Sequence, residues 1–159
     1  MNDSNEEPKP SALNLLLQTC VDGEEGYQLA ADSVKDAELK ETLSRYAAQR
    51  TRFRRELRVI LDWLAEKPDE QKTLSGTIHQ GWMNLKAVAK DGDERTILVE
   101  CVRGESAAIE RYAYGLKSGE LPDCALITVE RQSGEIKDAS RRMEELVQQY
   151  EENGAGRAA

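Results

Sequence analysis

The sequence is poor in the features that several protein classes require. Only 5% of its 159 residues are aromatic, and β-branched pairs are scarce, which argues against a β-sandwich or β-barrel. Acidic residues outnumber basic ones by 30 to 22, so the chain lacks the basic face that nucleic-acid binding needs. It also lacks an apolar run of about 18 residues and a basic-then-apolar signal segment. We therefore expect neither nucleic acid nor a membrane as a partner.

Cysteine and histidine are also rare. The three cysteines, Cys20, Cys101 and Cys124, form no CxxC pair, and an odd number suits the reduced thiols of a cytoplasmic protein better than a disulfide framework. The single histidine, His79, stands near Trp82, where a role in packing and hydrogen bonding is expected rather than one as a ligand or base. We expect a cytoplasmic protein without Cys–His chemistry.

What the sequence does contain is four long apolar stripes. Their members are spaced alternately by 3 and 4 residues, as in the seams of helical bundles, and the stripes run over 13–34, 39–64, 98–115 and 125–150. The members are Leu13, Leu17, Cys20, Glu24, Tyr27, Ala31 and Val34 in the first stripe; Leu39, Leu43, Tyr46, Arg50, Phe53, Leu57, Ile60 and Leu64 in the second; Leu98, Cys101, Glu105, Ala108, Tyr112 and Gly115 in the third; and Ala125, Val129, Gln132, Ile136, Ala139, Met143, Leu146 and Tyr150 in the fourth. The N-cap positions of the first two helices are assigned to Ser11 and Asp36, and Pro68 is expected to end the second helix.

The connection between the second and third stripes is long. It is too long for a structureless loop in a small domain, so we predict a short helix there, carrying Ile78, Trp82 and Leu85. The sequence thus predicts an all-α, four-helix bundle over 11–150, made of two hairpins joined by one crossover. Disordered tails are expected over 1–10 and 151–159.

The two hairpins look like copies of one unit. Residues 20–25 (CVDGEE) recur as 101–106 (CVRGES), which indicates an internal repeat. Each stripe also holds one polar residue near its middle: Glu24, Arg50, Glu105 and Gln132 in chain order. Because antiparallel helices of this length align their middles, we expect Glu24 and Glu105 to meet inside the bundle, with Gly23, Gly26 and Gly104 allowing the helices to approach closely.

Two buried carboxylates need a positive partner, since each would otherwise cost several kcal/mol. One interpretation is that Arg50, with five donors in a planar fork, bridges Glu24 and Glu105 while Gln132 satisfies the remaining lone pairs. The other is a metal site in which Glu24, Glu105 and Glu135 supply oxygen ligands to a hard cation.

The crossover, the duplicated hairpins and the mid-helix glutamates resemble the ferritin-like superfamily. Its di-iron sites imply a Glu-x-x-His motif on two of the helices, whereas this chain has Gln49-x-x-Arg52 and Gln132-x-x-Glu135. More narrowly, the chain is similar to a small bacterial ferritin-like family of uncharacterised function. The segments that carry this resemblance are Asp22-Gly23-x-x-Gly26-Tyr27, Ile78-His79-x-Gly81-Trp82-x-x-Leu85-Lys86 and Glu100-Cys101-x-x-Gly104-Glu105. The resemblance implies a fold and a bacterial cytoplasmic setting, and no activity.

The sequence therefore favours a non-catalytic bundle without a cofactor, acting through assembly or partner binding. We expect a homo-oligomer or a protein partner, because Val59 and Trp63 lie outside the second stripe and Trp82 adds a further apolar edge. The alternative is an iron- or manganese-binding protein, for metal handling or oxidoreduction, that uses Glu24, Glu105 and Glu135.

Overall fold

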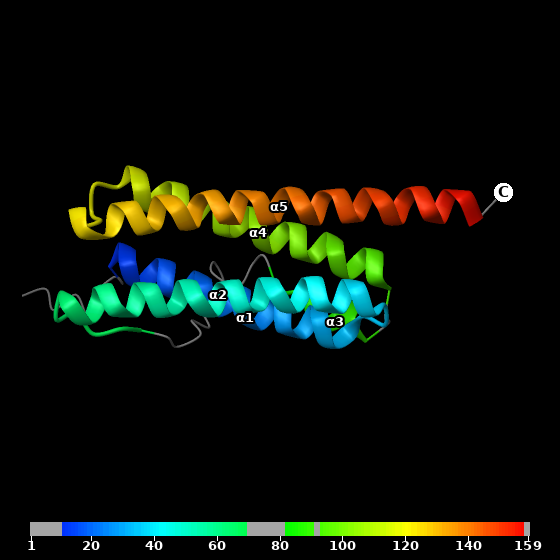
Figure 1. The fold of residues 1–159 in the computed structure, drawn as a ribbon, viewed down its shortest axis with the longest axis horizontal. Helices are drawn as coiled ribbons and strands as arrows, with labels where there is room; N and C mark the ends of the chain where they lie inside the picture. Colours follow the sequence, from blue (N-terminus) through cyan, green and yellow to red (C-terminus); the bar gives the residue numbers. More distant parts are fainter. Residues whose placement is uncertain (1–10, 70–81, 91–92, 158–159) are drawn as a thin grey trace, which may run out of the picture.

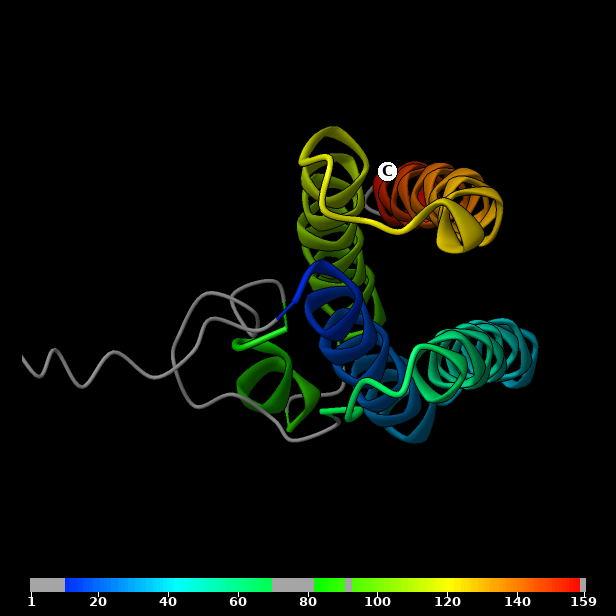
Figure 2. The same cartoon turned by 90° about the vertical axis from the view of Figure 1, so that its left-hand side faces the viewer.

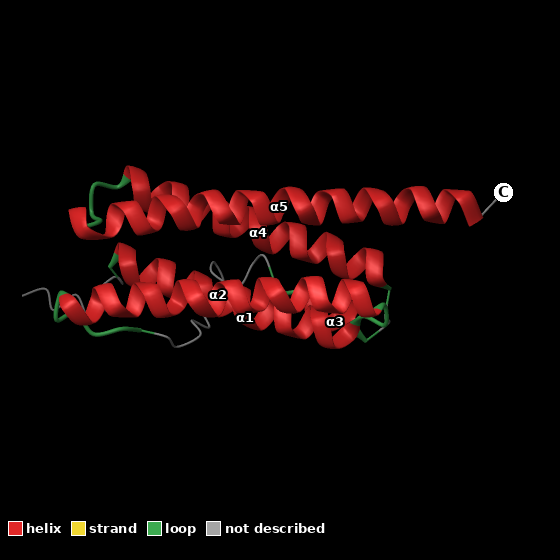
Figure 3. Ribbon diagram, in the orientation of Figure 1, coloured by secondary structure: helices red, strands yellow, loops and turns green. Residues whose placement is uncertain are grey.

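Helices account for most of the described backbone. The computed structural model describes residues 11–69, 82–90 and 93–157, and within these ranges there is no strand (Figures 1 and 3). The helices are α1 (Ala12–Ser33), α2 (Ala37–Trp63), α3 (Leu85–Ala89), α4 (Glu94–Lys117) and α5 (Asp123–Arg157). The predicted all-α bundle is confirmed.

The helices form two hairpins, α1 with α2 and α4 with α5. Helices α2 and α4 run in the same direction (Figure 1), which is why a long crossover has to join them. Viewed from the end, α1 and α4 pack together in the middle, α2 and α5 lie on one side, and α3 covers the other (Figure 2). Within the described residues, no helix is both long and apolar enough to cross a membrane.

The helix termini follow local hydrogen bonding. The side chain of Ser11 accepts from the Asn14 amide and that of Asp36 from the Leu39 amide, which confirms both predicted N-caps. Gly119 has φ +71° just beyond α4, a left-handed conformation that costs glycine little.

The end of α2 differs from the prediction. The helix stops at Trp63, well before Pro68, because Ala65 takes a left-handed φ of 55°. The Glu66 amide then donates to the Leu61 carbonyl at 2.9 Å, and the Ala65 amide to the Asp62 carbonyl at 3.1 Å. These two bonds form a Schellman motif, which ends the helix without help from proline.

The predicted apolar stripes form the core. Glu24, Tyr46, Ile60, Leu64 and Tyr150 are partly exposed, and all other members of the four stripes are buried. The apolar residues divide into two clusters, one around Leu17, Phe53 and Leu57 and one around Leu43, Leu98 and Met143. Along their stripes, Arg50 and Glu105 each lie between a residue of one cluster and a residue of the other, whereas Gln132 lies within the first.

The last helix is longer than predicted. It continues to Arg157, so the expectation of a disordered tail from residue 151 is wrong for 151–157. Once a helix exists, each added residue gains a hydrogen bond without a new nucleation step. Contacts with the start of α4 also hold this end: Tyr150 donates to Glu94 at 2.5 Å, and Arg95 pairs with Glu151 at 2.6 Å.

The crossover is described only in part. Its helix α3 is short, and Leu85 is buried against the cluster that contains Leu43 and Leu98. The expected tail over 1–10, together with Ile78, His79 and Gly81 of the crossover, lies outside the described residues.

Candidate functional site

A fully buried ion pair occupies the middle of the bundle. Arg50 on α2 reaches across to Glu105 on α4, and its Nη2 atom lies 2.6 Å from each carboxylate oxygen. The two side chains are 1% and 0% exposed. Burial alone would lower the pKa of the Arg50 guanidinium, but the adjacent Glu105 carboxylate and Tyr27 outweigh it and raise the pKa. Arg50 is therefore charged at neutral pH.

Other groups of the site enclose this pair. The Tyr27 hydroxyl donates to Glu105, and Arg50 Nε donates to the Gln49 side-chain oxygen at 3.4 Å. The guanidinium lies over the rings of Tyr27 and Phe53, 5.6 and 5.9 Å from their centroids, at cation–π distance. Burial, with a further contribution from the Glu105 charge, raises the pKa of Tyr27 well above its usual value, so the hydroxyl stays a donor.

A second chain of hydrogen bonds runs beside the first. Tyr112 on α4 donates to the Gln132 side-chain oxygen at 2.8 Å, and the Gln132 amide donates to the Phe53 carbonyl at 3.3 Å. The Cys20 sulfur lies 3.1 Å from the Tyr112 hydroxyl. Because the single Tyr112 proton goes to Gln132, the Cys20 thiol is the donor in that contact. These two sets of hydrogen bonds together form a polar layer, which links α1, α2, α4 and α5 near the middle of the bundle.

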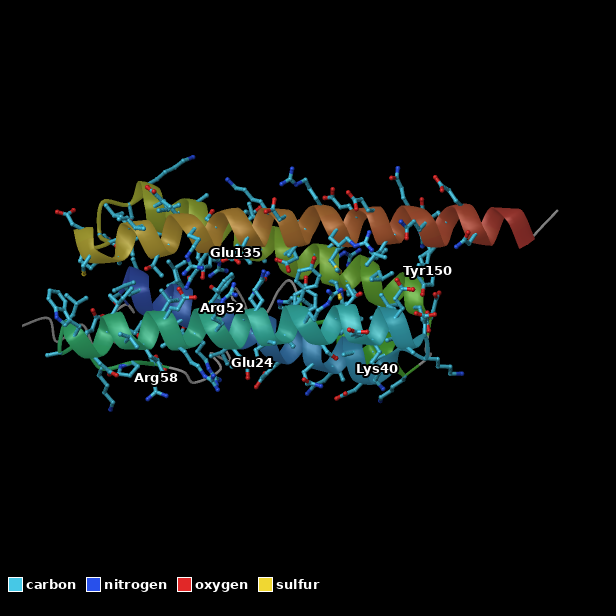
Figure 4. The ribbon with its side chains drawn as sticks, viewed as in Figure 1. Glu24, Lys40, Arg52, Arg58, Glu135 and Tyr150 are labelled. Atoms are coloured by element: carbon cyan, nitrogen blue, oxygen red, sulfur yellow. The ribbon has the colours of Figure 1, made fainter. Side chains whose placement is uncertain are left out.

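The two other glutamates lie at the edges of the bundle. Glu24 pairs with Arg54 at 3.5 Å, and Glu135 pairs with Arg52 at 2.6 Å and Arg131 at 2.7 Å. In the view of Figure 4, Arg52 and Glu135 lie between α2 and α5, and Glu24 lies on the other side of α2. The structure therefore gives Glu24 an ion pair with Arg54 instead of the expected shared contact with Arg50.

The three predicted metal ligands do not form one cluster. Glu105 is held by Arg50, whereas Glu24 and Glu135 are held by separate arginines. In the part of the chain that the structure describes, no three His, Cys, Asp or Glu side chains are grouped to hold a metal ion. One buried cation needs one buried carboxylate, and the other two glutamates are partly exposed, 27% for Glu24 and 33% for Glu135.

The mid-helix glycines make room for side chains instead of bringing helices together. A Cβ atom at Gly26 or at Gly104 would lie 2.2 Å from ring atoms of Trp82, and one at Gly23 would lie 3.1 Å from Arg50 Nη1. The Trp82 indole also packs edge-on against Tyr27, with centroids 5.1 Å apart. The expectation of close helix–helix approach at these glycines is thus corrected.

The sequence did not predict the roles that three aromatic residues have in the site. Tyr27 and Tyr112 were assigned to the stripes as ordinary core residues, yet both supply hydroxyls to the polar layer. Trp82 was expected on an apolar edge, yet it packs between two helices. A signal was present in Gly26 and Gly104, whose missing side chains leave the room that the Trp82 indole fills.

A family model matches the part of the chain that carries most of this site. Residues 10–118 match the family described as "Domain of unknown function (DUF2383)". The chain belongs to this family. The match to DUF2383 spans α1, α2 and α4, and so contains the Arg50–Glu105 pair, whereas Gln132 and Glu135 on α5 lie beyond it. A comparison with curated proteins found no match.

The cysteines of this DUF2383 protein are expected to differ sharply in reactivity. Burial raises the pKa of Cys20 to about 11, and burial together with Glu105 raises that of Cys101 further, so both thiols stay protonated at pH values near 8. Since thiolate is the reactive form and Cys124 alone is exposed, one thiol per chain should react promptly with Ellman's reagent.

The other two thiols should react only after unfolding in denaturant. Cys124→Ser is the matched variant, and it should abolish the prompt reaction while leaving the delayed one. Prompt reaction of two or more thiols in the native protein would contradict the burial of Cys20 and Cys101.

Proposed function

We propose that this chain is a non-catalytic, ferritin-like bundle in which a guanidinium takes the place of metal ions, and that it acts in the bacterial cytoplasm by assembling with copies of itself. The buried Arg50–Glu105 pair carries this proposal. It stands at the centre of the bundle, on the two helices that run parallel, where the superfamily resemblance implies a di-iron site.

The donor set does not fit iron or manganese. Both oxygens of Glu105 lie 2.6 Å from Arg50 Nη2, and a cation bound there would stand beside a permanent positive charge in a low-dielectric interior. Glu24 and Glu135 already neutralise Arg54, Arg52 and Arg131. Binding a metal would require several of these ion pairs to break at once.

Assembly is supported by an apolar strip on the outside of α2. Val59 and Trp63 are 67% and 76% exposed, and their spacing of four residues places them on one helix face. Tryptophan is enriched in the buried centres of interfaces, so a second copy of the chain could remove both side chains from water.

Metal analysis tests the first half of the proposal. Protein purified without chelator should contain iron and manganese well below one ion per chain. Stoichiometric metal that disappears in a Glu24→Gln, Glu105→Gln double variant would contradict it and favour the iron- or manganese-binding alternative.

Molar mass in solution tests the second half. Light scattering after gel filtration should give a mass above that of one chain, and Val59→Glu with Trp63→Glu should reduce it to the monomer. Ile127→Glu is the control, because Ile127 is equally apolar and 82% exposed but lies on α5. A monomeric native chain, or equal dissociation by the control, would contradict assembly through α2.

A further inference from the structure

A hollow lined with arginines lies between the N-terminal half of α2 and α5. Its volume is about 400 Å³, and its polar lining consists of Thr42, Arg45, Tyr46, Gln49, Arg52 and Arg142. No carboxylate lines it, although acidic residues exceed basic ones in the whole chain. Figure 4 shows Arg52 pointing into the space between the two helices.

The charge changes sign along this groove. A neighbouring hollow of about 630 Å³ shares Thr42 and Arg142 but is also lined by carboxylates, those of Asp36, Glu38, Asp93 and Glu94. An anion entering the groove would therefore be repelled at one end and attracted at the other. The charged residues that line the smaller hollow are Arg45, Arg52 and Arg142, and Arg52 also pairs with Glu135 at 2.6 Å and Glu56 at 3.6 Å.

Among the described residues, two of these guanidiniums make only long contacts with protein groups. Arg45 lies 3.5 Å from the Thr42 hydroxyl, and Arg142 lies 3.4 Å from Glu145, distances at the limit of hydrogen bonding. Arg52 makes a short bond to Glu135. Since each guanidinium has five N–H donors, the three side chains keep donors for a ligand.

The buried polar layer fixes the floor of the hollow. The Tyr46 ring lies 5.5 Å from that of Tyr27, and Gln49 accepts from Arg50. Burial raises the pKa of Tyr46 despite the opposing effect of Arg142, so its hydroxyl is protonated at neutral pH. A polar floor held by the core is preorganised for a ligand, which lowers the entropic cost of binding.

We propose that this hollow binds a small molecule carrying a phosphate group. A phosphate presents more oxygens than the two of a carboxylate, so it can engage the forks of Arg45, Arg52 and Arg142 together. The volume lies in the range of small-molecule sites. This site is independent of the assembly surface on α2 and of the Arg50–Glu105 pair.

Calorimetric titration of the full chain tests the proposal, with inorganic phosphate, pyrophosphate and citrate as probes at constant ionic strength. Phosphate and pyrophosphate should bind saturably, pyrophosphate more tightly than citrate. Arg45→Gln with Arg142→Gln should weaken binding roughly tenfold per arginine lost. Arg45→Lys, which keeps the charge but loses the fork, should give an intermediate affinity.

The control variant carries Arg103→Gln and Arg141→Gln. These exposed arginines, 58% and 71% accessible, lie outside the hollow, and their loss changes the net charge equally. The control should bind as the native chain does. Absence of saturable binding, equal weakening in the control, or tighter binding of citrate than of pyrophosphate would each overturn the proposal.

Discussion

Replacing Arg50 by methionine is expected to lower the free energy of unfolding by roughly 3–5 kcal/mol, the usual cost of removing one partner from a buried ion pair. The substitution would leave the Glu105 carboxylate, which is 0% exposed, with only the Tyr27 hydroxyl as a partner. Urea denaturation followed by circular dichroism measures the effect, because a lower midpoint at unchanged slope reports lost stability.

The design includes a matched control on the same helix. Arg54→Met removes the partner of Glu24, but Arg54 and Glu24 are 29% and 27% exposed, so solvent screening should keep the loss below about 1 kcal/mol. The double variant Arg50→Met, Glu105→Leu should recover most of the stability, since it strands no charge. Equal losses for Arg50→Met and Arg54→Met would contradict the buried pair.

Replacing Gly104 by alanine is expected to displace Trp82 from its place against α4. The new Cβ would lie 2.2 Å from an indole ring atom, so the ring must move, and overpacking of this kind costs roughly 1–3 kcal/mol. In a Trp63→Phe background, where Trp82 is the remaining tryptophan, its fluorescence emission should shift to the red as the indole meets water.

Gly134→Ala provides the comparison, because nothing lies within 4 Å of a Cβ atom at that position on α5. There the same change should stabilise the helix by up to about 1 kcal/mol. Trp82→Ala combined with Gly104→Ala should relieve the clash. If Gly104→Ala is tolerated as well as Gly134→Ala, Trp82 does not pack on α4.

The helical core could be predicted from spacing alone. Alternating steps of 3 and 4 residues select one side of each helix, and burial of that side follows from the hydrophobic effect. The same regularity indicated that Arg50, Glu105 and Gln132 point inward, and they are 1%, 0% and 0% exposed.

The partners within the polar layer could not be predicted in the same way. Spacing places a side chain on a face but does not determine which group it meets, and an ideal helix drifts by about 20° per heptad relative to the seam. Glu24 is an example: its carboxylate pairs with Arg54 at the edge of the bundle, although its place in the stripe predicted a contact with Arg50. Likewise, the repeat paired Gly23 with Gly104, but it did not indicate that Arg50 would lie against the first and Trp82, from a segment between the two copies, against the second.

Composition also gave a wrong prediction for the C-terminal end of α5. Two glycines and an asparagine in the segment 151–157 resemble a linker, yet the helix persists through them. Propensity is a weak guide where a long helix has already formed, and the ion pair between Arg95 and Glu151 is a tertiary contact that a local pattern cannot contain.

The division of the central ion pair between the two halves has a consequence for self-association. Arg50 belongs to the first hairpin and Glu105 to the second, although residues 20–25 of one and 101–106 of the other repeat the same motif. Two first hairpins from different molecules would bury two guanidiniums against each other, and two second hairpins would bury two carboxylates. Only a first hairpin and a second hairpin bring Arg50 and Glu105 together. The placement of the two charges therefore favours pairing of unlike hairpins over pairing of two identical ones.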